Sequence, residues 1–410
     1  MSFSRSHALH ARAARVIPNG LFGHRRSFAF VEGASVPIPD DYPRFVRGAR
    51  GCRFEDVDGN AYIDLLCGYG PMSVGYAEPS VDAAFAAQQA RGLCYDFPSE
   101  VEVLLAERLI ARQGASWAAF SLNGTDAISL ALTVARAATG RSVLLVAEGA
   151  YHGNLAATSF GAGRASEERS AVRAVPWGDL SALARRLRAE PVAAVLLCPW
   201  EQAVGAPNPL PAPGHWAEVR RQCDAAGALL ILDDVRSGFR VDSCRRFGIA
   251  PDLVCRSKAI ANGYPLAVTL GLEGSRAAAE EVFATGTFWG FPPAQAAALA
   301  TLDLLDARQG EAHMAAMGSV LTAGLREAAG RHGFELDITG PEAMPMVLFS
   351  GDPAHALSCA FARELVLRGV FAHPTHNWFL SLAHEEGDIH AVIERADDAL
   401  RALHARRGEP

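Results

Sequence analysis

Short apolar runs alternate with helix-like stretches from about residue 80 to residue 271. The runs are WAAFSL (117–122), SVLLVA (142–147), VAAVLLC (192–198), ALLILDD (228–234) and PLAVTLG (265–271). Strands this apolar are buried on both faces, and strands that alternate with helices form mostly parallel α/β sheets. Ligands of such sheets bind at the carboxyl ends of the strands. The sequence therefore predicts a large α/β domain with its ligand site at that edge.

The segments on either side of this region have other patterns. Residues 44–66 predict an antiparallel hairpin around an Asp58-Gly59 turn, and residues 310–405 read as helix, strands and helix. We therefore expect three parts. They are an N-terminal segment (1–50) that packs with the small domain, a large domain (51–305) and a small C-terminal α+β domain (306–410).

The composition disfavours several classes of protein. The 38 Lys and Arg residues against 45 Asp and Glu residues give a net charge of −7, whereas nucleic-acid binders usually carry a basic excess. No apolar run reaches the roughly 18 residues of a membrane span. The 8 cysteines are scattered without a C-x-x-C pair. This pattern favours reduced thiols in the cytoplasm over a disulfide framework or a zinc site.

Lys258 is the single lysine of the chain, so 37 of the 38 basic residues are arginines. Arginine cannot replace lysine where an amine must lose its proton, because the guanidinium group stays charged. Lys258 follows a short apolar strand and lies 25 residues after Asp233. A desolvated lysine near other cations becomes a nucleophile. The alternative is an ordinary surface lysine that lies beside the other candidate motifs by chance.

Two motifs follow apolar strands. Asn123-Gly124-Thr125 leads into a helix expected to run to about Ala138, and the free N–H groups of such a helix start bind anions. A plain helix N-cap explains the same residues. Asp233 and Asp234 end another strand, where a carboxylate can bind a cationic ring nitrogen, a metal or a hydroxyl. One solvated acid and one helix cap would explain them equally well.

Two further segments carry weaker signals. Tyr151-His152-Gly153 follows the strand at 142–147 and offers an aromatic ring that could stack on a planar cofactor. Gly286-Thr287 precedes a helix start at Pro292-Pro293 and is a possible phosphate contact. We expect no metal site, since His373 and His376 flank a proline and do not share a regular helical face.

Together these motifs describe the binding of a planar, phosphorylated aldehyde with a cationic ring, which is pyridoxal 5'-phosphate (PLP). In this interpretation the phosphate binds at Gly124-Thr125, the ring stacks on Tyr151, and its nitrogen faces Asp233. Lys258 holds the aldehyde as an imine. The glycine-rich and nucleophile-elbow motifs of competing cofactor and hydrolase classes (G-x-G-x-x-G, G-x-x-x-x-G-K-[ST], G-x-S-x-G) do not occur.

The whole set of motifs resembles the class III aminotransferases of fold type I, and within them the glutamate-1-semialdehyde 2,1-aminomutase group. The resemblance covers nearly the whole chain. It rests on RVIPNG (15–20), EDVDGNAYIDLLCGYGPMSVGYAEP (55–79), NGTDA (123–127), AYHGN (150–154), ILDDVRSGFRV (231–241), PDLVCRSKAIANGYP (251–265), GTFWGFPPAQAAALA (286–300) and WFLSLAH (378–384).

This resemblance implies a fold type I PLP-dependent transferase with a large, mostly parallel-sheet domain and a smaller α+β domain. It also implies a homodimer with shared active sites. By position, Lys258 is the imine lysine and Asp233 the partner of the ring nitrogen. The remaining cofactor residues are Asn123, Gly124 and Thr125 at the phosphate, Tyr151 and His152 at the ring, and Thr287 at the phosphate of the neighbouring subunit. The implied substrate contacts are Arg26, Tyr69 and His376. Arg26 would bind a carboxylate, and the adjacent Arg25 is the alternative for this role.

Several positions depart from the family pattern. Asn123 replaces a serine, Asp234 a glutamate, Cys198 a Glu-Pro pair, Arg236 a smaller or neutral residue, His376 an acid, and Trp289 and Phe291 small polar residues. These departures disfavour the semialdehyde as substrate, with neutral drift as the alternative explanation. The aromatic residues favour an aromatic or cyclic substrate, whereas Arg236 and His376 favour an acidic or hydroxylated one.

The predicted function is transfer of an amino group between an amino-acid donor and a carbonyl substrate in specialised metabolism. Lys258 would move a proton between the substrate carbon and the cofactor. An intramolecular aminomutase uses the same residues, and decarboxylation or racemisation could occur on the same scaffold. Two alternatives from other classes are a non-catalytic binding protein and a metal-dependent hydrolase that uses Asp233 and Asp234.

Overall fold

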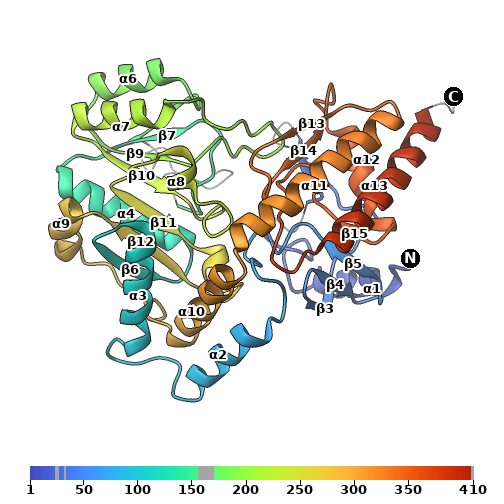
Figure 1. Cartoon of the computed structure of the whole chain (residues 1–410), viewed down its shortest axis with the longest axis horizontal. Helices are drawn as coiled ribbons and strands as arrows, with labels where there is room; N and C mark the ends of the chain where they lie inside the picture. Colours follow the sequence, from blue (N-terminus) through green and yellow to red (C-terminus); the bar gives the residue numbers. More distant parts are fainter. Residues whose placement is uncertain (24–26, 32–33, 156–169, 408–410) are drawn as a thin grey trace. The chain divides into compact units, whose positions relative to one another are not determined.

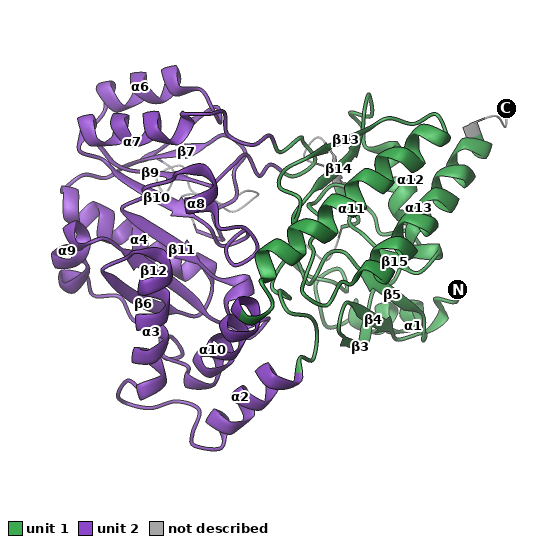
Figure 2. Ribbon diagram, in the orientation of Figure 1, with its two compact units in different colours: residues 1–78, 204–208, 307–410 green, residues 79–203, 209–306 purple. Residues whose placement is uncertain are grey.

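The computed structural model describes residues 1–23, 27–31, 34–155 and 170–407 (Figure 1). The chain divides into two compact units, drawn in separate colours in Figure 2. Unit 1 comprises residues 1–78, 204–208 and 307–410, and unit 2 comprises residues 79–203 and 209–306. Each unit has its own sheet and its own cluster of buried apolar side chains.

Unit 2 is built on a seven-stranded sheet with the order β6-β12-β11-β10-β9-β7-β8. The strands are β6 (Trp117–Ser121), β7 (Val143–Ala147), β8 (Val172–Val175), β9 (Val192–Leu197), β10 (Leu229–Asp233), β11 (Leu253–Arg256) and β12 (Ala267–Gly271). β12 runs antiparallel to β6 and β11, whereas the other neighbouring pairs are parallel. The prediction of a mostly parallel α/β sheet is confirmed.

The five apolar runs form β6, β7, β9, β10 and β12. All residues of β9 and β12 are buried, as expected for strands that are covered on both faces. The apolar pattern does not predict β8. This strand is short, lies at the edge of the sheet and buries only its last residue fully, so it needs no apolar run.

The helices of unit 2 include α4, which packs against β11 and β12. The helices are α2 (Pro79–Gln89), α3 (Glu100–Gln113), α4 (Gly124–Thr139), α6 (Leu180–Ala189), α7 (His215–Ala226), α8 (Ser243–Phe247), α9 (Arg276–Glu281) and α10 (Pro292–Ala307), with short 3-10 helices η2 (Lys258–Ala261) and η3 (Glu273–Ser275). In α4, Ile128 and Val134 are completely buried, and each contributes about 1.5–3 kcal/mol to folding. Gly140, in the left-handed conformation, ends the helix close to its predicted limit.

Unit 1 contains a four-stranded sheet with the order β15-β5-β4-β3. Its strands are β3 (Val46–Arg50), β4 (Arg53–Asp56), β5 (Ala61–Asp64) and β15 (Val370–Phe371). The predicted hairpin around Asp58-Gly59 is the antiparallel pair β4 and β5. β15 pairs in parallel with β5 and so joins the two ends of the chain. This pairing explains why residues 51–78 belong to unit 1, which differs from the large-domain boundary predicted at residue 51.

The rest of unit 1 consists of helices and short strands, of which α12 contacts β15. Its further elements are α1 (Ser4–Ala13), β1 (Ala29–Val31), β2 (Ala34–Val36), α11 (Gly310–Arg331), β13 (Leu336–Thr339), β14 (Met346–Phe349), α12 (Ala356–Leu367) and α13 (Glu386–Arg407). The aromatic rings of Phe54 and Tyr62 stack with a centroid distance of 4.9 Å, and both rings lie in the same buried cluster as Val366 of α12.

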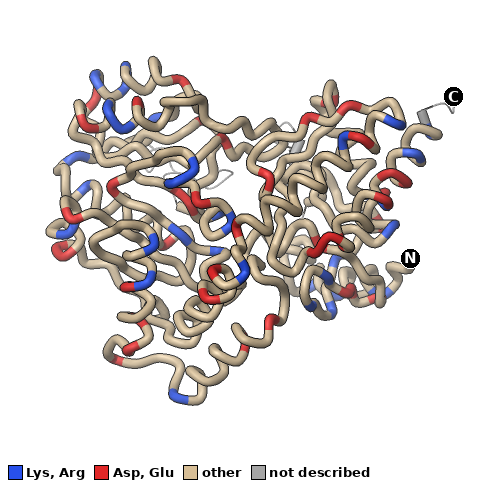
Figure 3. The backbone as a smooth tube through the Cα atoms, viewed as in Figure 1, with Lys and Arg blue, Asp and Glu red and all other residues tan. Residues whose placement is uncertain are grey.

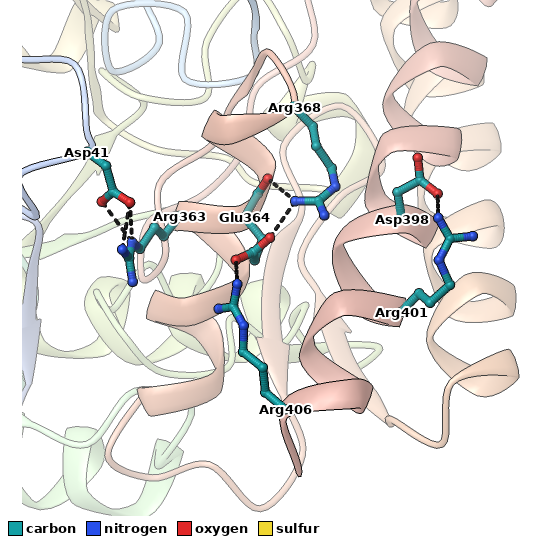
Figure 4. Close-up of polar contacts among 7 residues, drawn as sticks. All are labelled: Asp41, Arg363, Glu364, Arg368, Asp398, Arg401 and Arg406. Atoms are coloured by element: carbon teal, nitrogen blue, oxygen red, sulfur yellow. Dashed lines mark hydrogen bonds and ion pairs between the residues drawn. The ribbon is translucent and has the colours of Figure 1, made fainter. Parts of the chain in front are cut away.

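Charged residues of both signs are intermixed along the chain (Figure 3). In unit 1 the Glu364 carboxylate, which is 3% exposed, bridges two guanidinium groups (Figure 4). It accepts from Arg368 on the C-terminal side of α12 and from Arg406 of α13, the latter at 2.5 Å. Within the described residues, the structure contains no helix with the length and apolar composition needed to span a membrane.

Candidate active site

The register of two neighbouring parallel strands, β10 and β11, sets the positions of Lys258 and Asp233. Asp233, the last residue of β10, lies opposite Cys255 in β11. The chain leaves β11 one residue later and begins η2 at Lys258. Lys258 has a φ of +47°, a left-handed conformation that costs about 1–2 kcal/mol for a residue other than glycine. Strained residues of this kind concentrate at functional sites.

The amine of Lys258 is poised to lose its proton. Burial is the main cause that lowers its pKa to about 8, and the positive charges of Arg236 and Arg240 add to this effect. The Asp233 carboxylate acts in the opposite direction. About one Lys258 amine in ten is therefore deprotonated at pH 7, far more than for an ordinary lysine.

The Asp233 carboxylate is held through both of its oxygens. His152 Nδ1 lies 2.7 Å from Asp233 Oδ2, and the Val235 N–H donates to Asp233 Oδ1 at 3.1 Å. Both His152 and Asp233 are buried. The other ring nitrogen of His152, Nε2, is buried and has no hydrogen-bond partner among the described residues. The arrangement fixes the plane of a carboxylate at the carboxyl edge of the sheet.

The N-terminus of α4 approaches the same edge. Asn123 caps the helix, since its side-chain oxygen accepts from the Asp126 N–H at 3.1 Å. A Cβ atom at Gly124 would lie 2.7 Å from Cγ1 of Val235, so glycine is required for this close approach. Thr125 Oγ1 accepts from the N–H of Asn154 at 3.1 Å, which connects the helix start to the segment that contains His152.

Tyr151 and Arg236 complete the group of residues around Lys258. The Tyr151 side chain is about half exposed. Burial of the remainder raises the pKa of its phenol, and the nearby Arg236 charge opposes the rise. Arg236 donates to the carbonyl oxygen of Gln202 at 3.4 Å, and burial lowers the pKa of its guanidinium. The charge of Arg236 thus acts on both the Lys258 amine and the Tyr151 phenol.

A buried ion pair joins the ends of β10 and β11 beside these residues. Arg256 Nε lies 3.0 Å from Asp234 Oδ2, and both side chains are at most 4% exposed. Ser237 and Ser243 donate to Asp234 Oδ1 at 2.6 and 3.0 Å. Burial raises the pKa of Asp234, against the lowering effect of the Arg256 charge. The sequence reasoning missed Arg256, although a parallel register between the two strands would have predicted that it faces this acid.

The other residues singled out from the sequence belong to other segments of the chain. Thr287 of unit 2 is exposed, and its carbonyl oxygen accepts from Cys94 Sγ at 3.4 Å. Tyr69 and His376 belong to unit 1, where their rings form an edge contact at 5.2 Å. His373, which the sequence reasoning did not assign to the site, lies 5.7 Å from His376 and 5.9 Å from Tyr69 by ring centroid. Arg26 lies outside the described residues.

The chain is similar to known proteins over nearly its whole length. The family profile described as Aminotransferase class-III matches residues 37–400. The chain is 39% identical over 407 residues to the aminopentol aminotransferase of Sphingopyxis macrogoltabida, which covers 98% of this chain and 94% of that protein. The chain belongs to the class III aminotransferase family. This class III aminotransferase is a PLP-dependent enzyme.

Two further relatives bear on its fold and activity. The structure of the PLP internal aldimine form of the Sphingopyxis sp. MTA144 FumI protein matches this aminotransferase with a TM-score of 0.94 and 39% identity, and covers 99% of this chain and 98% of that one. This likeness confirms the prediction of fold type I. The glutamate-1-semialdehyde 2,1-aminomutase of Roseiflexus castenholzii is 34% identical over 445 residues and covers 100% of both chains. The aminomutase is thus the more distant of these relatives.

The residues on the carboxyl edge fit PLP chemically. An ionisable carboxylate held through both oxygens suits a protonated ring nitrogen. An amine with a pKa near 8 suits imine formation. The glycine-dependent start of a 16-residue helix suits a phosphate group. All of these groups lie in unit 2.

Proposed function

We propose that Lys258 is the amine that binds the cofactor and that Asp233 is the partner of its ring nitrogen. Asn123, Gly124 and Thr125 hold the phosphate, while Tyr151 stacks on the ring and His152 orients Asp233. The observation that carries this proposal is the parallel register of β10 and β11. It brings the single lysine of the chain to the end of the strand next to Asp233. There burial and the charges of Arg236 and Arg240 lower the pKa of its amine.

When bound, PLP supplies an aldehyde that condenses with amines and a protonated ring that withdraws electrons from the bond to be broken. The protein supplies the proton chemistry. Lys258 Nζ takes the proton from the substrate carbon that carries the amine, for which its lowered pKa suits it. The Asp233 carboxylate favours the protonated form of the ring nitrogen, and the hydrogen bond with His152 keeps that carboxylate in place.

Reductive trapping tests the role of Lys258. Borohydride should fix the cofactor to Lys258. Peptide mapping distinguishes this site readily, because Lys258 is the single lysine and the N-terminal amine is the other primary amine of the chain. Lys258→Ala should bind the cofactor without covalent fixation and lose amino transfer by several orders of magnitude. Attachment to the N-terminal amine alone would show that the assignment is wrong.

The amine substrate is proposed to carry several hydroxyl groups, with an amino acid and its keto acid as the second pair. The relative that is 39% identical acts on an aminopentol, which is such a compound. The cluster of Tyr69, His373 and His376 offers a phenol and two imidazoles, which can exchange hydrogen bonds with hydroxyls. Arg26 remains the proposed contact for the carboxylate of the amino or keto acid.

Substrate screening distinguishes these roles. Amino alcohols should be deaminated with a keto acid as acceptor, and matched alkylamines without hydroxyls should have a lower kcat/KM. His376→Phe should reduce this preference for hydroxylated amines, whereas Arg26→Ala should raise KM for the keto acid. An equal kcat/KM for hydroxylated and plain amines in the wild type would overturn the substrate assignment.

A homodimer is proposed from an exposed apolar surface in unit 2, which we call the 93–288 surface. It comprises Leu93, Tyr95, Phe97, Val103, Leu104, Phe283 and Phe288. Phe97 and Phe283 are 81% and 94% exposed, and the Cys94–Thr287 hydrogen bond connects the two segments that carry them. Exposed apolar surface of this kind marks interaction sites. Thr287 lies within it, in agreement with a role at the phosphate of the neighbouring subunit.

The oligomeric state tests this surface. Light scattering should give twice the chain mass for the wild type and a large fraction of single chains for Phe97→Asp combined with Phe283→Asp. Leu272→Asp is the control, since Leu272 is exposed in unit 2 but outside the 93–288 surface. A monomeric wild type would contradict the proposal.

An intramolecular aminomutase is the second candidate, because the aminomutase relative is aligned over the whole chain. The two activities differ in the fate of the nitrogen. A labelled amino donor should pass its nitrogen to a separate carbonyl acceptor in a transferase. In an aminomutase the label should stay with the carbon skeleton that carried it.

A further inference from the structure

Three side chains with different donor atoms meet at the carboxyl ends of β7, β9 and β10. Leu232 of β10 lies opposite Leu197 of β9, so the next residues, Asp233 and Cys198, emerge side by side. β7 pairs with β9 on its other side, and His152 follows β7 by five residues. A ring nitrogen of His152, Sγ of Cys198 and a carboxylate oxygen of Asp233 all lie within 4.8 Å of one another.

This donor set has the chemistry of a zinc-type site. Imidazole nitrogen, thiolate sulfur and carboxylate oxygen are the three ligand classes of Zn²⁺, and three protein ligands leave a fourth position open. Tetrahedral bonds of about 2.0–2.3 Å place ligand atoms roughly 3.3–3.8 Å apart. The cluster therefore needs shifts of about 1 Å, including a widening of the 2.7 Å contact between His152 and Asp233.

All three side chains are shielded from solvent. His152 is 1% exposed. Cys198 and Asp233 are also buried, at 6% each. The Coulomb attraction for a cation is stronger there than at the surface.

We propose that His152, Cys198 and Asp233 bind one divalent cation of the zinc type when PLP is absent, and that the cation and the cofactor exclude each other. The mutual exclusion rests on the proposed function, because the cation and PLP would both use the Asp233 carboxylate. The binding of the cation does not depend on the proposed function. On binding, the S–H bond of Cys198 breaks, its proton passes to the solvent, and the thiolate forms the bond to the metal.

Cobalt(II) is the probe, because its bond to a thiolate absorbs in the near ultraviolet. The full-length protein freed of cofactor should bind about one Co²⁺ per chain with this absorption. Cys198→Ser should lose the absorption and bind Co²⁺ at least tenfold more weakly, yet take up PLP as well as the wild type does. Cys359→Ser is the matched control, since it removes a partly buried cysteine of unit 1 outside the cluster and should change neither property.

Competition tests the exclusion. Added PLP should release Co²⁺ in equilibrium dialysis, and Co²⁺ should slow the uptake of PLP. Absence of Co²⁺ binding, or a thiolate absorption that survives in Cys198→Ser, would overturn the site. Retention of Co²⁺ at saturating PLP would overturn the exclusion alone. The trapping of cofactor on Lys258 is measured separately, so either failure can be distinguished from failure of the proposed amino transfer.

Discussion

Arg256 pairs with Asp234 through Nε and Oδ2 at 3.0 Å, in a contact where neither side chain is more than 4% exposed. Asp234 directly follows Asp233, and Arg256 precedes Lys258 by two residues. The ion pair therefore joins the ends of β10 and β11 at the point where each presents a site residue. Arg256 also lies over the ring of Phe239, with its Cζ 5.1 Å from the ring centroid.

Removal of one member of this pair should destabilise the protein strongly. Arg256→Met leaves the Asp234 carboxylate buried without its counter-charge, which costs about 3–5 kcal/mol. Urea denaturation followed by circular dichroism measures the loss. Arg245→Ala, which removes a guanidinium that is 79% exposed, should cost about 1 kcal/mol or less. The double variant Arg256→Met with Asp234→Asn should recover part of the loss, and full additivity of the two changes would contradict this account.

The reactivity of Lys258 should depend on pH with a midpoint near 8. The protonated amine does not react with acylating or arylating reagents, so labelling of the cofactor-free protein should be slow below this pH and rise as pH increases through it. Arg236→Gln removes a positive charge that lowers the pKa of Lys258 and should move the midpoint upward. Mass spectrometry of the Lys258 peptide follows the reaction. A wild-type midpoint above 10, or a midpoint that Arg236→Gln leaves in place, would refute the electrostatic explanation.

The close approach of Gly124 to Val235 should control cofactor affinity. In Gly124→Ala the new Cβ would lie 2.7 Å from Val235 Cγ1, and overpacking of this kind costs about 1–3 kcal/mol. We expect PLP affinity to fall about tenfold or more, measured by absorbance titration. Val235→Ala in the same chain should restore part of the affinity. Gly330→Ala, at a position with nothing within 4 Å, should have no effect.

The buried Glu364 of unit 1 should contribute more to stability than an exposed acid in the same unit. Glu364→Gln weakens hydrogen bonds to two arginines around a carboxylate that is 3% exposed, and about 1–3 kcal/mol should be lost. Asp398→Asn changes a 51% exposed acid paired with Arg401 and should cost less than about 1 kcal/mol. Differential scanning calorimetry compares the two. Equal shifts in Tm would argue against a structural role for the Glu364 bridge.

Much of the fold could be predicted from the sequence because the relevant signals are local. Strands covered on both faces need continuous apolar runs, which identified β6, β7, β9, β10 and β12. The N-G-T segment predicted the start of α4, and the lysine count drew attention to Lys258. β8 escaped this reasoning because an edge strand can be short and partly exposed.

The order of strands in the sheet is not a local signal, and most of the candidate site depends on it. His152, Cys198 and Asp233 lie far apart in the sequence, and they meet because β9 lies between β7 and β10. The same holds for residues 51–78, which join unit 1 through pairing of β5 with β15. His373 lies beside His376 and Tyr69 because of the conformation of a loop, and the hydrophobic periodicity of the sequence does not predict loop conformations.

The sequence by itself determined that one amine, Lys258, is available for lysine chemistry, because arginine cannot lose its proton under ordinary conditions. Only the tertiary structure decided that this amine has a pKa near 8. The physical reason is that a pKa depends on desolvation and on the charges nearby, here those of Arg236, Arg240 and Asp233. The packing of neighbouring strands, rather than the order of residues along the chain, sets both.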